Sequence, residues 1–368
     1  MPCYHPLKNF VLAEKTLERP GQYKCVPYSV NALRVRDDGT FQYLYDDDSI
    51  NFWLGQGEII RDFVEIPCGK CIGCRLMYSK QWMVRCLLER EYHDSAYFLT
   101  LTYTDDSVPI SWYHDPKHDT GEAFQALTLR KKDFQGFMKR LRRYSGQDLR
   151  FFAAGEYGPK TFRPHYHAIV FGLYLDDLKL YACDHGINYY TSEFVSKCWS
   201  VPHKGRRRKD ELPEPMGRVL IGDCTPQSCA YVSRYVTSKL MGPSSWFYHV
   251  FNIEPPFALM SRNPGLARLW YDDHPGWKDE DYIHIADVEK GLKVRPPHYF
   301  DYLLDKEDPE ELERVKQARR RISQYAERLR ASQSDLQYLD RLAVAERSQQ
   351  ARARALLRPL EKGDELNA

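Results

Sequence analysis

At residues 163–172 the chain reads Arg163-Pro164-His165-Tyr166-His167-Ala168-Ile169-Val170-Phe171-Gly172. The apolar, β-branched run at the end of this stretch predicts a β-strand. Residues i and i+2 of a strand face the same side, so His165 and His167 are expected side by side on a stiff backbone. Two imidazoles held in this way direct their ring-nitrogen lone pairs together, and they form a pair of candidate metal ligands.

A third candidate ligand lies on the preceding strand. Residues 149–156 and 165–173 both read as strands, and the loop between them is rich in turn-forming residues. If the two strands form a hairpin, Glu156 lies across from the histidines and brings a carboxylate to the same face. Two imidazoles and one carboxylate leave positions open for water or phosphate oxygens on a divalent ion such as Mg²⁺ or Mn²⁺. Taken alone, a histidine pair of this kind on a strand is more often structural than metal-binding.

The neighbouring segments predict the fold class. Residues 97–103 and 219–221 read as strands, residues 128–144 as an amphipathic helix, and residues 226 to about 241 as a helix with Thr225 as its cap. This order of elements predicts an α+β fold, in which an antiparallel sheet of about five strands is packed with helices. Residues 22–65 read as short strands and turns.

The chain divides into four expected parts. These are an N-terminal region over residues 1–94, a core over 95–242, an irregular extension over 243–307 and a charged helical tail over 308–368. Apolar residues in the tail recur near a 3.5-residue period, so it is expected to pack as a helical hairpin on the body or to pair with another chain.

Charge and composition limit the possible partners. The net charge is only +2, but two basic runs occur, one in the helix at 128–144 and one at 204–209. Either run is compatible with an ordinary solvated face, and both together near a metal motif favour a polyanion. Aromatic residues make up 14% of the chain, which is enough to offer faces for stacked bases. The candidate DNA-binding residues are Arg130, Lys131, Lys132, Lys139, Arg140, Arg142, Arg143, Arg163, Arg206, Arg207 and Arg208.

No signal peptide or membrane span is visible, so we expect a protein of the cytoplasm that has no membrane partner. Ten cysteines in a reducing compartment are not expected to form disulfides. The segment Cys68-Gly69-Lys70-Cys71-Ile72-Gly73-Cys74 places three thiolates at a spacing that can wrap a tetrahedral Zn²⁺, with Cys3 as the favoured fourth ligand. Free, partly buried thiols are the alternative, and iron–sulfur ligation has no other support in the sequence.

A second candidate constellation lies in the helix that begins near residue 226. Tyr231, Tyr235 and Lys239 are spaced four apart, so they project from one face. The spacing is also compatible with an aromatic core stripe. A phenol with a pKa of about 10 is a poor nucleophile at neutral pH and needs a base, a cation or a metal-activated electrophile. Metal-bound phosphate beside these tyrosines would form a coherent phosphoryl-transfer site.

Taken in order, these segments carry a family resemblance. The strand Phe98-Leu99-Thr100-Leu101-Thr102-Tyr103, the stretch Gly155-Glu156-Tyr157-Gly158, the segment around His165 and His167, and the paired tyrosines resemble the ordered motifs of HUH endonucleases. In particular, they resemble those of the replication initiators of small single-stranded DNA phages, the gokushovirus branch of the Microviridae. The resemblance covers roughly residues 65 to 241, and it implies a ferredoxin-like or RRM-like sheet with the histidines on a central strand.

The resemblance also implies a function. It implies a nickase for rolling-circle replication, in which one tyrosine attacks the origin phosphate, stays joined to the 5′ end and frees a 3′ hydroxyl. A second tyrosine then cuts the regenerated origin, and the strand is closed into a circle. By position, Glu156, His165 and His167 would hold Mg²⁺ or Mn²⁺, and Tyr231 and Tyr235 would be the nucleophiles.

One departure from the family pattern concerns the lysine. Such initiators often place lysine three residues after the second tyrosine, where this chain has Ser238, so Lys239 is the nearest substitute. The implied partners are single-stranded and origin DNA, with a replicative helicase and polymerase of the bacterial host, in the cytoplasm of that host. Two alternatives stay open: a non-catalytic, zinc-containing nucleic-acid-binding protein, and a metallohydrolase that uses a bound water.

Overall fold

The computed structural model describes residues 3–13, 21–114, 121–158, 161–184, 186–201, 214–235, 245–280, 282–285 and 291–355. For Asp184, Tyr235 and residues 353–355 it describes the backbone alone. The chain forms two compact units. We call residues 1–77 with 326–356 the small unit, and residues 78–325 with 357–368 the large unit.

The large unit is built on an antiparallel sheet of seven strands, which confirms the predicted α+β class. In spatial order they are β12 (Lys179–Asp184), β13 (Ile187–Thr191), β14 (Val219–Asp223), β7 (Ala96–Leu101), β11 (Pro164–Phe171), β10 (Arg150–Tyr157) and β15 (Phe257–Met260). The sheet has two more strands than the expected five, since β12 and β15 extend its edges. Strand β15 comes from residues 243–307, where irregular structure was expected.

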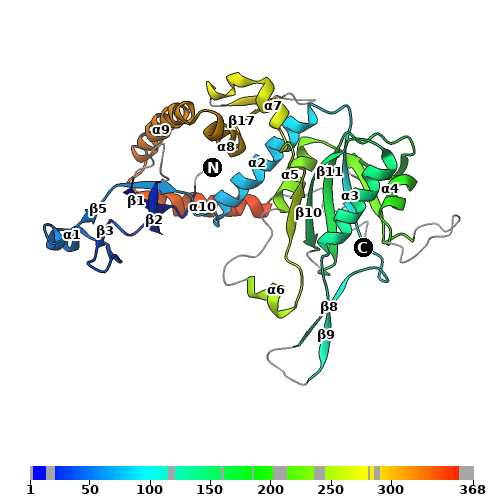
Figure 1. Ribbon diagram of the computed structural model, residues 1–368, viewed down its shortest axis with the longest axis horizontal. Helices are drawn as coiled ribbons and strands as arrows, with labels where there is room; N and C mark the ends of the chain where they lie inside the picture. The colour runs from blue at the N-terminus through cyan, green and yellow to red at the C-terminus, as the bar shows by residue number, and fades with distance from the viewer. Residues whose placement is uncertain are drawn as a thin grey trace. The chain divides into compact units, whose positions relative to one another are not determined.

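Strand β11 lies inside this sheet and every one of its residues is buried. Its alternate side chains face two different helix layers, because successive residues of a strand point to opposite sides. Ile169 and Phe171 face a core that includes residues of α2 (Ile72–Arg90), α5 (Pro226–Tyr235), α7 (Arg268–Asp273) and α8 (His298–Glu307). Tyr166, Ala168 and Val170 face a core formed with α3 (Lys131–Ser145) and α4 (Glu193–Cys198), which lie against the sheet in Figure 1.

Two helices follow their sequence signals closely. In α3, Phe134, Phe137, Met138 and Leu141 are buried, as their i, i+3, i+4, i+7 spacing predicts. The helix ends at Gly146, whose φ of 66° is the left-handed conformation that glycine adopts without strain. Helix α5 begins at Pro226, and the side chain of Thr225 accepts a hydrogen bond from the Ser228 N–H at 3.1 Å.

A buried carboxylate joins α2 to the sheet. Glu89 is 1% exposed, pairs with the guanidinium of Arg150 at the start of β10, and accepts a hydrogen bond from the Ala267 N–H at 2.6 Å. His93 Nε2 lies 3.2 Å from Glu89 Oε1, the same carboxylate oxygen that pairs with Arg150. Burial alone would raise the pKa of Glu89, but these partners outweigh it and hold the pKa below its ordinary value.

Apart from the long helix α9 (Pro309–Ala331), the remaining elements of the large unit are short. They are the hairpin β8 (Ile110–His114) and β9 (Ala123–Leu127), α6 (Trp246–Val250), the 3₁₀ helix η2 (Pro275–Lys278), and the pair β16 (Ile283–Ile285) and β17 (Leu292–Val294). Helix α9 begins here and continues into residues assigned to the small unit.

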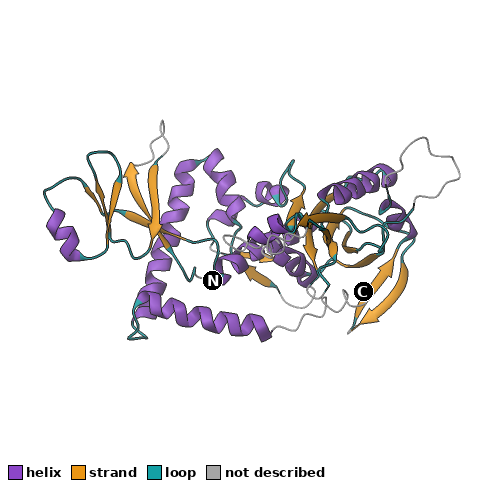
Figure 2. Cartoon of the chain, turned by 90° about the horizontal axis from the view of Figure 1, so that it is seen from below, coloured by secondary structure: helices purple, strands orange, loops and turns teal. Residues whose placement is uncertain are grey.

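The small unit contains two three-stranded sheets together with helices (Figure 2). One sheet has the order β2 (Gln22–Pro27), β1 (Leu7–Ala13) and β6 (Phe63–Ile66); the other has the order β4 (Phe41–Leu44), β3 (Ala32–Val35) and β5 (Ile59–Ile60). Helix α1 (Asp47–Trp53) follows β4, and α10 (Tyr338–Ala355) closes the unit.

The predicted helical tail is confirmed by α9 and α10, and α10 contacts the N-terminal part of the small unit. The Tyr338 hydroxyl donates to Glu65 at 2.7 Å, and the Tyr338 ring lies 5.6 Å from that of Tyr28. Among the described residues, no helix has the length and apolar character needed to cross a membrane.

Candidate functional site

Three side chains converge on one face of β10 and β11. Glu156 pairs directly with His165 across the two strands, as the predicted hairpin requires. Glu156 Oε1 lies 2.9 Å from His165 Nε2 and 3.4 Å from His167 Nε2. The three side chains each bring one ligand atom to within 4.8 Å of the others.

The backbone and a neighbouring strand orient both imidazoles. His165 Nδ1 lies 3.2 Å from the carbonyl oxygen of Arg163, and His167 Nδ1 lies 3.0 Å from Thr100 Oγ1 on β7. With the proton on Nδ1, each ring donates to its oxygen partner and turns the lone pair of Nε2 toward Glu156. Metal-binding histidines are held in this way, with the second nitrogen bonded to an oxygen of the protein.

The surroundings of Glu156 favour its ionised carboxylate over the protonated acid. Glu156, His165 and His167 are only 6%, 7% and 1% exposed. Burial alone would raise the pKa of Glu156, but hydrogen bonds and positive charge from the two histidines outweigh it and lower the pKa. A buried anion facing two imidazole nitrogens is compensated either by a proton on the histidines or by a bound cation, so the donor set fits a divalent ion.

Two aromatic rings complete the surroundings of His167. Phe98 stacks on the imidazole with ring centroids 5.5 Å apart, and Tyr231 of α5 meets it edge-on at 5.0 Å. Tyr231 is 3% exposed. Sequence reasoning identified Tyr231 but assigned no role to Phe98 or Thr100, although both lie on the strand that it recognised. Phe98 and Thr100 face the same side of β7, and the pairing of Thr100 with His167 between β7 and β11 brings both residues to the site.

The other two members of the tyrosine–lysine constellation are less fully described. Tyr235 is the last residue of α5, four residues after Tyr231, and only its backbone is described. Lys239 lies outside the described residues, as do Arg206, Arg207 and Arg208.

The basic residues of α3 lie on the opposite side of the sheet from the histidines, because α3 packs on the core that contains Tyr166 rather than His167. On and beside this helix the exposed basic residues are Arg130, Lys131, Lys132, Lys139, Arg142 and Arg143.

Three of the candidate arginines are engaged within the protein. Arg140 Nε donates to the Cys198 carbonyl at 2.7 Å, and Arg142 donates to the Leu149 carbonyl at 2.8 Å. Arg163 binds Asp105 at 2.6 Å and the Tyr103 carbonyl at 2.7 Å.

A second group of candidate metal ligands lies in the small unit. Cys3, Cys68, Cys71 and Cys74 bring their sulfur atoms to within 4.8 Å of one another. All four are free thiols, and only Cys71 is buried. The structure thus brings together the four cysteines that were predicted from the sequence as candidate zinc ligands.

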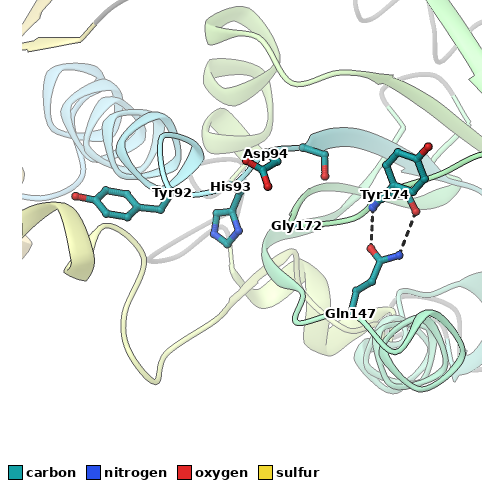
Figure 3. A pocket seen from close by; sticks show the side chains of 7 residues that line it. Tyr92, His93, Asp94, Gln147, Gly172 and Tyr174 are labelled. Atoms are coloured by element: carbon teal, nitrogen blue, oxygen red, sulfur yellow. Dashed lines mark hydrogen bonds between the residues drawn. The ribbon is translucent and has the colours of Figure 1, made fainter.

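A pocket of about 670 Å³ lies at the other end of β11, beyond Phe171 (Figure 3). Its lining includes Gln147, Gly172 and Tyr174, and the Gln147 side chain bonds to both the N–H and the carbonyl of Tyr174, at 2.7 and 3.2 Å. The length of the strand puts this pocket roughly 20 Å from the histidine cluster. It is therefore separate from the candidate site.

Comparison with known proteins gives consistent matches. A family model of replication-associated proteins of the ORF2 type matches residues 96–240, which include both histidines and both tyrosines. The chain is 29% identical to the replication-associated protein ORF2 of Spiroplasma virus 4, over 92% of this chain and 98% of that protein. No solved structure is a significant match.

Two further relatives match over shorter ranges. Replication-associated protein VP4 of Bdellovibrio phage phiMH2K is 28% identical over 66% of this chain and 69% of that protein. Replication-associated protein ORF4 of Chlamydia phage 1 is 29% identical over 48% of this chain and 39% of that protein. By these matches, the chain is similar to replication-associated proteins of small single-stranded DNA phages.

Proposed function

We propose that this protein is a rolling-circle replication initiator that cuts and rejoins DNA at a phage origin through a tyrosine nucleophile. The observation that carries the proposal is the convergence of His165 Nε2 and His167 Nε2 on Glu156 Oε1, at 2.9 and 3.4 Å, beside the ring of Tyr231. A pair of imidazoles and a carboxylate next to a phenol is the set of groups that phosphoryl transfer to tyrosine requires.

Glu156, His165 and His167 would hold Mg²⁺ or Mn²⁺. A divalent ion bound there would neutralise charge on a phosphodiester and make its phosphorus more electrophilic. The contacts from Thr100 and the Arg163 carbonyl hold the two rings with Nε2 toward Glu156, so the ligands of a divalent ion would be in place before DNA binds. Phe98 limits rotation of the His167 ring by stacking on it.

Tyr231 and Tyr235, one helical turn apart on α5, are the two proposed nucleophiles, and either can make the first cut. In that cut the phenolic oxygen forms a bond to the phosphorus, the bond from phosphorus to the 3′ oxygen breaks, and the phenolic proton ends on the 3′ oxygen, so the products are a 5′-phosphotyrosine and a free 3′ hydroxyl. The other tyrosine would make the second cut, and the released 3′ hydroxyl would then displace the first tyrosine. Lys239 would add positive charge near the scissile phosphate.

Because Tyr231 is only 3% exposed, we expect DNA binding to open access to its phenol. The same burial is what a core tyrosine would have, so it also favours the alternative of a non-catalytic, zinc-containing nucleic-acid-binding protein. These two functions make opposite predictions for covalent attachment.

Single-stranded and origin DNA are the proposed substrates. The exposed basic residues around α3 would bind backbone phosphates away from the cutting site, since they lie on the other face of the sheet. The relatives are proteins of phages that infect bacteria, so we place the reaction in the host cytoplasm, with a host helicase and polymerase extending the free 3′ hydroxyl.

The experiment is a search for a covalent adduct between protein and DNA. Purified protein is incubated with circular single-stranded DNA that contains the phage origin, with Mg²⁺ or Mn²⁺, and analysed on a denaturing gel. Tyr231→Phe, Tyr235→Phe, the double variant and His167→Ala are compared with Tyr174→Phe, which alters a ring that is 70% exposed.

We expect an adduct with the wild type and Tyr174→Phe, and none with the double tyrosine variant or with His167→Ala. Chelation should abolish the adduct, and added Mn²⁺ should restore it. A metal-dependent nick without an adduct would identify a hydrolase that uses water. Binding to origin DNA without either product would favour the non-catalytic alternative.

A further inference from the structure

The four clustered cysteines of the small unit come from two places in the sequence. Cys3 precedes β1, Cys68 follows β6, Cys71 immediately precedes α2, and Cys74 lies in the first turn of that helix. We propose that Cys3, Cys68, Cys71 and Cys74 together bind one structural Zn²⁺ ion. Their four sulfur atoms lie within 4.8 Å of one another, which is the donor set of a closed tetrahedral zinc site.

Strand pairing explains why the distant cysteine reaches the others. β1 and β6 are antiparallel, and Leu7 at the start of β1 pairs with Ile66 at the end of β6. The residues just before β1 and just after β6 therefore emerge at the same end of the sheet. Gly69 then adopts a φ of 72°, a left-handed conformation that turns the chain between Cys68 and Cys71.

Backbone N–H groups around the cluster point at its sulfur atoms. Cys3 Sγ accepts a hydrogen bond from the Cys68 N–H at 3.2 Å, and Cys71 Sγ accepts one from the Tyr4 N–H at 3.3 Å. Cys68 Sγ accepts from the N–H groups of Lys70 and Cys71 at 3.4 and 3.3 Å. The backbone thus fixes the positions of three of the four sulfur atoms before any metal ion binds.

The spacing of the sulfur atoms fits a single ion. With zinc–sulfur bonds of about 2.3 Å, a regular tetrahedron has sulfur atoms about 3.8 Å apart. Cys3 Sγ and Cys71 Sγ lie 3.9 Å apart. An iron–sulfur cluster would hold its thiolates farther from one another, because its own iron and sulfide atoms lie between them.

The hydrophobic cores of the small unit are small, so a bound metal ion would add to its stability. Its described hydrophobic clusters are small: one contains the buried residues Phe10, Val26, Val30 and Leu33, and the other contains Ala32, Leu44 and Ile50. Cores of this size stabilise a fold weakly, and a structural zinc ion adds its binding free energy to folding. The proposed ion would tie together the start of β1, the end of β6 and the first turn of α2.

The test measures zinc content and thiol protection in the full-length protein, purified anaerobically with zinc in the growth medium. Native protein is treated with iodoacetamide before and after removal of metal by a chelator, and the labelled cysteines are identified by mass spectrometry. We expect close to one zinc per chain, with Cys3, Cys68, Cys71 and Cys74 unlabelled until the chelator is added.

Other cysteines of the chain serve as internal controls. Cys25 and Cys183 are exposed, so they should be labelled with or without chelator. Cys86, Cys198, Cys224 and Cys229 are buried, so they should stay unlabelled until the protein unfolds. Equal labelling of the four proposed ligands before and after chelation would overturn the proposal, as would a bound iron cluster in place of zinc.

Two variants separate this site from the histidine cluster. Cys71→Ser should lose most of the zinc, while the matched Cys25→Ser, which changes an exposed thiol of the same unit, should keep it. His167→Ala should keep one zinc per chain. If the Cys71 variant does not fold, the labelling of the wild type still decides the question. The result does not depend on the proposed nicking reaction, because no step of the test involves DNA.

Discussion

Tyr166 lies between the two candidate metal ligands in sequence, yet it points to the opposite face of the sheet. Its ring is 0% exposed, and its hydroxyl accepts a hydrogen bond from the Arg130 N–H at 3.1 Å. The hydroxyl donates to the Arg130 carbonyl at 3.0 Å, and it lies 2.7 Å from the Tyr103 hydroxyl in a hydrogen bond that either oxygen can donate. Arg130 caps the start of α3 without a side-chain hydrogen bond of its own, so the Tyr166 phenol serves as the cap.

The change Tyr166→Phe removes this hydroxyl and keeps the ring. It deletes about two hydrogen bonds worth roughly 1 kcal/mol each, and it leaves buried polar atoms of Arg130 and Tyr103 without that partner, so we expect a total loss of about 3 kcal/mol in the free energy of unfolding. Metal affinity at His165 and His167 should not change, because the hydroxyl lies on the other face.

The assay is urea unfolding followed by tryptophan fluorescence, to which Trp199 contributes from a ring centroid 5.6 Å from that of Tyr166. The control is Tyr174→Phe, which should change stability by less than about 0.5 kcal/mol. A loss below about 1 kcal/mol in Tyr166→Phe would refute the view that the phenol caps α3. A large loss of metal affinity would refute the separation of the two faces.

Three further changes test other parts of the large unit. Glu89→Gln should lower the free energy of unfolding by about 3 kcal/mol at neutral pH, because it leaves the charge of Arg150 without its buried partner. The pKa of Glu89 is lowered in the folded protein, so its contribution is present above the ordinary carboxyl pKa and is lost as pH falls through the folded value. The difference between wild type and variant should therefore shrink in urea titrations at acid pH, and a constant difference would contradict this. Thr100→Val should weaken Mn²⁺ binding by roughly 10-fold or more, measured by calorimetry, because the histidine beside it loses an orienting oxygen; unchanged affinity would show that stacking alone orients the ring. Gly217→Ala should cost about 3 kcal/mol, because a Cβ there would lie 2.1 Å from the carbonyl oxygen of Thr102; thermal unfolding measures the loss, and a wild-type melting temperature would contradict it.

Much of the sheet could be predicted because its strands carry strong local signals. The alternation around His165 and the turn-forming loop before it were enough to predict that Glu156 faces the histidines, and the register confirms this pairing. Short spacing selected Cys68, Cys71 and Cys74, and Cys3 was the favoured fourth ligand although it is distant in sequence.

Other features depend on long-range packing that no local pattern records. β12 and β15 are short edge strands, and their place in the sheet is set by their neighbours rather than by their own alternation. The contact of Thr100 with His167 depends on how β7 pairs with β11, which the sequence of either strand leaves open. The periodicity of α3 identified its basic outer side but not the face of the sheet that it covers.

The composition of the small unit has a consequence for the order in which the newly made chain folds. Residues 326–356 complete a unit that otherwise consists of the first 77 residues, so synthesis of the whole intervening segment separates its two parts. The four proposed zinc ligands all lie within the first 74 residues, so the proposed ion could bind early in translation. Helix α10 can add its contacts to Tyr28 and Glu65 only near the end of synthesis. If translation stopped before residue 326, the large unit would be almost complete, but the small unit, which contains the first 77 residues, would lack α10.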